Sequence, residues 1–347
     1  MVNSIPSRHL GRWLLGALWA LARPASAAPA LPAGFLWPCA ADSSHGLPPA
    51  SPADSIKLKV KTKPGHRPWR TEYPVAPGVT WHYDRPGQLR WLLHIPRDVA
   101  QFPGTYFKRA NVPAFVAIAL GSAALYAADD AIIHGSQNVG RFIGLDNADV
   151  QKNLFYIPLH IGSSKVPLEL KVPGNLNSTF YFLGDGWTHL TIASSFLAYG
   201  IIKKDNRAAQ TATQLGEAIL STGLVVQALK RTTGRQSPFR STHDRGRWDF
   251  LPSYTTYQGN VSNYDAFPTG HLATAMATVT VIAENYPEHH YIRPVGYGLM
   301  GVLGYAMLNN GVHWASDYPL GIALGYGFAK IAVRNGRTRV PEAALPV

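Results

Sequence analysis

The chain has 347 residues, of which 46% are hydrophobic, so it is long and apolar enough to bury a substantial core, and disorder throughout is excluded. Its single cysteine, Cys39, excludes an internal disulfide framework, a CxxC redox pair and a zinc site built from several thiolates. The formal net charge of +12 suits anionic membrane surfaces or phosphate-bearing substrates, although a generic basic surface is the simpler explanation. No sequence pattern of a nucleic-acid-binding module is present, and we expect no nucleic-acid partner.

The N-terminus has the pattern of a secretory signal. Arg8 and Arg12 precede a short apolar run over residues 13–22, and small residues follow over 24–27. This order is typical of a signal peptide, and the apolar run is too short to span a bilayer well. We therefore expect residues 1–27 to be the signal peptide of an exported protein, either periplasmic or membrane-associated. An uncleaved membrane anchor is the alternative.

Residues 28–104 are rich in proline, which fixes the backbone angle φ and removes an N–H donor, so we expect an irregular extension here. Within it, residues 56–61 alternate apolar side chains with lysines, which is the period-two signal of a strand with one wet face. We expect these lysines to protect a sheet edge; docking to an anionic surface is the alternative.

From residue 105 the sequence changes to alanine- and glycine-rich apolar segments with helical spacing, which predicts a helical domain over residues 105–335 and a tail over 336–347. The predicted helices cover residues 112–128, 187–202, 214–232, 269–285, 294–309 and 312–333. Long stretches within this domain lack charged residues, a pattern that buried helices and weakly hydrophobic spanning helices share. We expect a membrane-associated bundle, and the pattern does not decide whether it spans.

A GxGxxG pattern occurs at Gly296, Gly298 and Gly301. It lies inside an apolar helical stretch rather than between a strand and a helix, which excludes a dinucleotide-binding turn. We expect these glycines to permit close packing of helices.

The first residues with a chemical pattern are Lys230 and Arg235, at the end of a predicted helix that Gly234 terminates. Two cations here would neutralise the oxygens of a phosphoryl group, as chemistry at phosphorus requires. The alternative for Lys230 is a favourable interaction with the helix dipole.

The second pattern is Pro268, Thr269, Gly270 and His271 at the start of the next predicted helix. Pro268 suits the first helical position, and the amides that follow would form an anion pocket at the positive end of the helix. His271 at the rim would protonate a leaving oxygen and later deprotonate water. The alternative is a helix start that happens to carry a histidine.

The third pattern is His313 and Asp317, four residues apart and so expected on one face of a helix. The carboxylate would accept the Nδ1–H of the imidazole and leave Nε2 as a nucleophile. An ordinary surface pair is the alternative.

Together these patterns resemble the three-part signature of the type 2 phosphatidic acid phosphatase (PAP2) superfamily, which includes bacterial class A acid phosphatases and vanadium haloperoxidases. That signature reads KxxxxxxRP, then PSGH, then SRxxxxxHxxxD. Lys230 and Pro238 keep the register of the first part, residues 268–271 match the second with threonine in place of serine, and His313 and Asp317 match the third.

The resemblance implies an all-α bundle of about six core helices and a metal-independent phosphatase without a cofactor. It implies hydrolysis of a phosphate monoester through a phosphohistidine at His313, with Asp317 orienting that ring and His271 acting as acid and then base. The residues implied to hold the phosphoryl oxygens are Lys230, Arg235, Ser237, Thr269 and Gly270. We expect a lipid phosphate as substrate, with a soluble phosphate ester as the alternative.

Two positions depart from the signature. Ser237 and Met307 stand where the family has arginines that clamp phosphate oxygens, and their loss would cost several kcal/mol of transition-state binding. The residues that could replace them are Arg231, Arg235, Arg240, Arg245, Asn309 and Asn310. Pro319 is expected to kink the last helix.

These departures keep two other functions open. One is a non-catalytic scaffold or phospholipid-binding protein with the same fold. The other is vanadate-dependent halide oxidation, in which the same histidine would hold vanadate.

Overall fold

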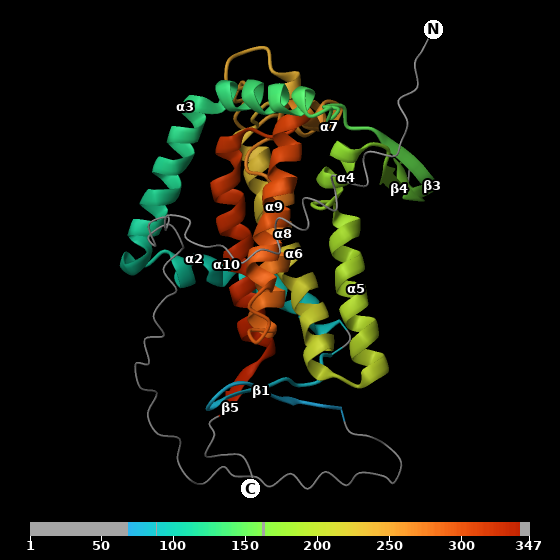
Figure 1. Ribbon diagram of the computed structural model, residues 1–347, viewed down its shortest axis with the longest axis vertical. Helices are drawn as coiled ribbons and strands as arrows, with labels where there is room; N and C mark the ends of the chain where they lie inside the picture. The colour runs from blue at the N-terminus through green and yellow to red at the C-terminus, as the bar shows by residue number, and fades with distance from the viewer. Residues whose placement is uncertain (1–68, 88, 162–163, 341–347) are drawn as a thin grey trace, which may run out of the picture. The chain divides into compact units, whose positions relative to one another are not determined.

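The computed structural model describes residues 69–87, 89–161 and 164–340 (Figure 1). The predicted signal peptide, the predicted strand over residues 56–61 and Cys39 lie outside the described residues.

Three long helices form the centre of the bundle: α6 (Asn206–Thr233), α8 (Gly270–Asn285) and α10 (Tyr318–Gly336). Figure 1 shows them running side by side. They share a fully apolar core made of Leu215, Ala218, Ala277, Val281, Ala329, Ala332 and Val333. Two further helices flank them, α5 (Gly186–Lys203) against α6 and α9 (Ile292–Asn309) against α8.

Local sequence explains where α6 begins and ends. The Asp205 carboxylate accepts the Ala208 amide at 2.9 Å and so caps the first turn. Gly234 ends the helix in the left-handed region at φ 55°, a conformation that glycine adopts without steric cost. This confirms the predicted end of the helix and places Lys230 in its last turn.

Close approach of α10 to the start of α8 positions the chemistry. A Cβ atom added at Gly321 would lie 2.5 Å from the Thr269 carbonyl oxygen, and one added at Gly325 would lie 2.0 Å from that of Ala273. Since only glycine fits at such distances, the two helices meet backbone to backbone. The residues just before α10 are thereby held against the N-terminus of α8.

Helix α3 (Val112–Phe142) rises along the bundle and crosses its end (Figure 1). Among the described residues, the helical stretch Arg109–Phe142 is the one long and apolar enough to cross a membrane, and only 11% of its most apolar window is buried. The remaining α-helices are α2 (His94–Tyr106), α4 (Leu176–Phe182) and α7 (Tyr254–Gly259). Short 3₁₀ helices lie at Arg90–Leu93, Arg109–Asn111, Pro238–Arg240, Val261–Asn263 and Ala315–Asp317 (η2 to η6).

Strands form two small antiparallel sheets. In the first, β2 (Val79–His82) pairs with both β1 (Glu72–Ala76) and β5 (Thr338–Val340). The second is a hairpin of β3 (Gln151–Ile161) and β4 (Ser164–Pro173).

The prediction of a helical bundle is confirmed, and five of the six predicted helices lie where expected, although α3 extends well beyond residue 128. The start of the sixth is wrong. Residues 312–317 form a turn and the 3₁₀ helix η6, and α10 begins at Tyr318. Pro319 therefore lies in the first turn of α10, where its missing N–H is no loss, and the expected kink has no basis. Sequence analysis also missed β1, β2 and α2 in the proline-rich region, and the β3–β4 hairpin with α4.

The glycines of the GxGxxG pattern have different surroundings. A Cβ atom at Gly296 would lie 2.6 Å from the Val279 methyl groups, which confirms the expected close packing of α9 on α8 at this position. At Gly298 and Gly301 an added Cβ would meet nothing within 4 Å, so close packing is not the reason for these two glycines.

The contact between α8 and α10 makes a stability prediction. Gly325→Ala should lower the free energy of unfolding by about 3 kcal/mol, because the new methyl group collides with backbone rather than with a flexible side chain. Gly223→Ala in α6 is the matched control, since its Cβ enters open space; it should be neutral or stabilise by up to about 1 kcal/mol. Chemical denaturation of both variants measures the difference, and equal stabilities would contradict the packing described.

Candidate active site

The three sequence patterns converge at one end of the bundle. Lys230 comes from the last turn of α6, His271 from the first turn of α8, and His313 from the turn before α10. The ring centroids of His271 and His313 lie 6.0 Å apart, with the ring planes inclined by 67°. Two imidazoles from distant parts of the chain therefore share one small site.

The orientation of His313 is fixed by a backbone carbonyl. Its Nδ1 lies 2.7 Å from the Ala266 carbonyl oxygen. A carbonyl oxygen can only accept a hydrogen bond, so Nδ1 carries the proton and Nε2 keeps its lone pair. His313 is 3% exposed, and this buried contact selects the tautomer that nucleophilic attack through Nε2 requires.

Asp317 was expected to accept that Nδ1–H, and this detail is wrong. Its Oδ2 lies 3.6 Å from His313 Nδ1, beyond a hydrogen bond, and instead accepts the Trp314 amide at 2.8 Å. The geometric reason is that His313 precedes the helical residues, so the two side chains do not share a helix face. Ala266 rather than Asp317 sets the orientation of the His313 ring.

Burial keeps both histidines neutral. It lowers the pKa of His313 to about 3, with the nearby Lys230 ammonium adding to the effect. Burial also lowers the pKa of His271 well below its ordinary value, assisted by His313 and Lys230. A neutral His313 is the form with a nucleophilic Nε2.

The N-terminus of α8 faces the Lys230 ammonium. A Cβ atom placed on Gly270 would lie 3.9 Å from Lys230 Nζ, and no side chain caps the first turn of this helix. Helix amides and a cation together make an anion site. Thr269, however, was expected to offer its amide to phosphate, and that amide donates to the Asp317 carbonyl at 3.1 Å. The amides from Gly270 onward are the ones left for an oxyanion.

Lys230 also has a partner that sequence analysis missed. Its Nζ lies 3.6 Å from Asp265 Oδ2, and the Asp265 side chain is 30% exposed whereas that of Lys230 is 7% exposed. The carboxylate is thus the more solvent-exposed member of the pair. Any phosphoryl group that binds Lys230 must compete with Asp265.

Arg235 does not face this pocket, which corrects its expected role. It is fully buried, and its donors reach Asp129 Oδ2 at 2.7 Å, Asp317 Oδ1 at 2.5 Å and Ser316 Oγ at 2.7 Å. The Arg245 carbonyl oxygen accepts two more bonds from the same guanidinium. Its donors are engaged within the protein, so Arg235 organises the site rather than holding phosphate.

Ser237 and Met307, which stand where the signature has arginine, are both buried and packed against other residues. The Ser237 amide donates to the Ser262 carbonyl at 3.0 Å, and the residue is buried. Met307 is fully buried in an apolar cluster, and the Thr269 hydroxyl lies 3.9 Å from its sulfur.

The side chains considered as replacements have partners of their own. Arg231 bonds Gln227, and Asn309 bonds Asn177. Arg245 lies 3.8 Å from Asp130. Arg240 lies over the Phe239 ring. The Asn310 Nδ2 is buried without an acceptor among the described residues.

An aromatic ring completes the wall beside His271. The Tyr181 ring of α4 lies with its centroid 4.5 Å from that of the imidazole. Nothing in the sequence pattern pointed to Tyr181, since α4 itself was not predicted. Within the described residues, no group of three or more His, Cys, Asp or Glu side chains is arranged to hold a metal ion.

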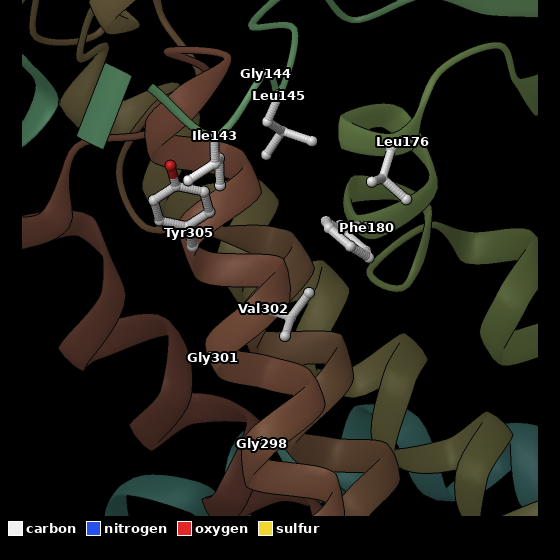
Figure 2. Close-up of a pocket in the computed structure, with 9 residues that line it drawn as sticks. All are labelled: Ile143, Gly144, Leu145, Leu176, Phe180, Gly298, Gly301, Val302 and Tyr305. Carbon is white, nitrogen blue, oxygen red and sulfur yellow. The ribbon is translucent and has the colours of Figure 1, made fainter. Parts of the chain in front are cut away.

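A separate apolar groove of about 580 Å³ lies between α4 and α9 (Figure 2). Phe180 and Val302 line it, whereas their neighbours Tyr181 and Leu303 belong to the cluster packed around the site. The groove is therefore lined by residues adjacent in sequence to Tyr181, which contacts His271, and to Leu303. The remaining lining residues are Ile143, Gly144, Leu145, Leu176, Gly298, Gly301 and Tyr305.

A comparison with protein-family models agrees with the signature. Residues 211–341 match the family model of the PAP2 superfamily, a segment that contains Lys230, His271, His313 and Asp317. Among solved structures, that of Aquifex aeolicus LpxE is similar, with 21% sequence identity over 46% of this chain and 83% of that chain and a TM-score of 0.34. No curated protein matches the chain in sequence.

The lowered pKa of His313 predicts how stability depends on pH. The unfolded histidine takes up a proton below about pH 6.5, whereas the folded one does so only near pH 3. Its contribution to folding is therefore full above pH 6.5 and falls as the pH drops toward 3. His313→Asn, whose amide can still donate to Ala266, should flatten the acid loss of unfolding free energy in this window. Denaturation curves from pH 4 to 7 test this, and parallel slopes for both proteins would refute it.

Proposed function

Because residues 211–341 match the family model of the PAP2 superfamily, we propose that the protein is a metal-independent phosphatase that hydrolyses a phosphate monoester through His313. The observation that carries this proposal is the pairing of two imidazoles with ring centroids 6.0 Å apart, of which the buried His313 is held with Nε2 free. That separation leaves room for a phosphorus atom between an attacking nitrogen and a leaving oxygen.

In the first step, Nε2 of His313 attacks phosphorus and forms a P–N bond while the P–O bond to the leaving group breaks. His271 gives its proton to the leaving oxygen, which departs as an alcohol. Burial lowers the pKa of His271, and the negative charge of a bound phosphoryl group raises it and favours the protonated form.

In the second step, His271 takes a proton from water, and the resulting hydroxide attacks phosphorus. The P–N bond breaks, inorganic phosphate leaves, and His313 returns to its neutral form. The same residue serves as acid and then as base because its proton is lost in the first step and recovered in the second.

Charge is offset without a metal in this scheme. Lys230 and the amides that begin at Gly270 face the phosphoryl oxygens. The phosphorylated His313 ring carries a positive charge with Nδ1–H still bonded to Ala266, and the Asp317 carboxylate 3.6 Å away stabilises it.

We favour a lipid phosphate as the substrate, hydrolysed at a membrane surface by an exported protein. The apolar groove beside the site and the exposed apolar side chains of α3 and α9 support this choice. The side chains concerned include Val116, Leu120, Val139, Phe142, Val295 and Leu299. A soluble phosphate ester remains the alternative substrate.

A catalytically impaired phospholipid-binding protein is the second candidate function. Two observations favour it: Met307 and Ser237 are buried at the positions of the missing arginines, and Asp265 already pairs with Lys230. Such a protein would bind a phosphate headgroup without turnover.

The direct test is His313→Ala in the purified full-length chain, assayed with lipid and soluble phosphate esters in the presence of a chelator. Wild type should hydrolyse at least one ester, and the variant should lose activity by about 10³-fold or more, because the nucleophile is gone. Acid-quenched wild type should carry phosphate on residue 313 by mass spectrometry. His290→Ala, which alters an exposed histidine, is the matched control and should retain full activity.

Binding of a phosphate headgroup without hydrolysis by the wild type would support the second candidate instead. Equal activity of wild type and His313→Ala would contradict the proposed mechanism.

Asp265 gives a second prediction. Asp265→Asn should strengthen inhibition by inorganic phosphate by about tenfold, because the anion no longer competes with a carboxylate for Lys230. Inhibition constants at neutral pH measure this effect, with Asp249→Asn as a control at an exposed carboxylate paired to Arg247. Weaker inhibition of the Asp265 variant would show that the carboxylate assists binding.

A further inference from the structure

A carboxylate outside the PAP2 segment reaches the centre of the site. Asp129 lies on α3, a helix whose surface is mostly exposed and apolar, yet the residue itself is fully buried. An unpaired carboxylate at such a place would be costly, so its partners explain why it is tolerated.

Those partners are the residues that frame Asp317. Asp129 Oδ2 accepts from Arg235 at 2.7 Å and from the Ser316 hydroxyl at 2.6 Å, and its Oδ1 accepts from the Ser316 amide at 3.1 Å. Both of its oxygens are thus used, and each bond goes to a residue that is also adjacent to Asp317 in sequence or bonded to it.

Charge explains why this matters for the chemistry. Arg235 bridges two carboxylates, Asp129 and Asp317, so the buried group carries one positive and two negative charges. Without Asp129, the guanidinium would be balanced by Asp317 alone. The guanidinium would then offset the whole charge of Asp317, the loop that carries Asp317 would lose the two hydrogen bonds of Ser316, and Arg235 would lose one.

We propose that Asp129 is a positioning residue for the reaction: it balances Arg235 and anchors the Ser316–Asp317 loop, so that Asp317 keeps its charge for the His313 ring. This inference rests on the proposed function, because the ring becomes positive only when phosphorylated. Asp129 has no contact with the phosphoryl group. It acts in the step that makes or breaks the P–N bond rather than in substrate binding.

The test compares Asp129→Asn with Asp130→Asn in the full-length chain. Asp130 is the neighbouring residue on α3, and it is more than one third exposed and pairs with Arg245. Asp129→Asn should lower kcat by about 10- to 100-fold while KM and the affinity for tungstate change less than about twofold. Asp130→Asn should leave all three unchanged. A general loss of structure would instead change KM and tungstate affinity together with kcat.

Ser316→Ala provides a second variant that keeps every charge and removes the hydroxyl bonds to Asp129 and Arg235. It should give the same kcat-selective loss, smaller than that of Asp129→Asn, and it decides the matter if Asp129→Asn does not fold. Equal kcat for wild type, Asp129→Asn and Ser316→Ala would overturn the inference while leaving the phosphatase proposal intact. An inactive wild type would overturn both.

Discussion

The hydrogen bond from His313 Nδ1 to the Ala266 carbonyl is the contact on which the site depends. It fixes the tautomer, and with it the availability of Nε2. The amide of Ala266 donates to the Arg235 carbonyl at 3.0 Å. Ala266 therefore connects three segments: the one after α6, the one before α8 and the one before α10. Close glycine contacts between α8 and α10 hold this arrangement in place. The helices therefore serve the site chiefly by bringing three loops within hydrogen-bonding distance.

The buried charges around Arg235 contribute more to the geometry and electrostatics of the site than to the free energy of folding. Desolvating an arginine and two carboxylates is expensive, and such groups are often no more stabilising than apolar residues of similar size. Their value here is geometric and electrostatic. Arg235 holds Asp317 from one side, Asp129 balances Arg235, and one negative charge remains near the imidazole that becomes positive during the proposed reaction. This division explains why Arg235, although it lies close to the site, need not touch phosphate.

Sequence reasoning found the residues whose chemistry shows in their type and spacing. Lys230, His271 and His313 were singled out from the sequence and lie close together in the fold, and most helix positions followed from apolar periodicity. It could not find Ala266, because a backbone carbonyl has no residue signature, nor foresee that Arg235 turns inward, because spacing does not give direction. Asp129 had one signal, an acidic residue at the end of a long uncharged stretch. The β3–β4 hairpin also had a sequence signal, because apolar residues occur at every second position over 166–172, as in a strand.

The most direct test of the shared oxyanion site is an experimental structure of the chain with bound vanadate. The account predicts vanadium bonded to Nε2 of His313, with His271 within hydrogen-bonding distance of the opposite apical oxygen and Lys230 turned from Asp265 to an equatorial oxygen. Vanadate bound through Nδ1, or located away from the two histidines, would contradict it.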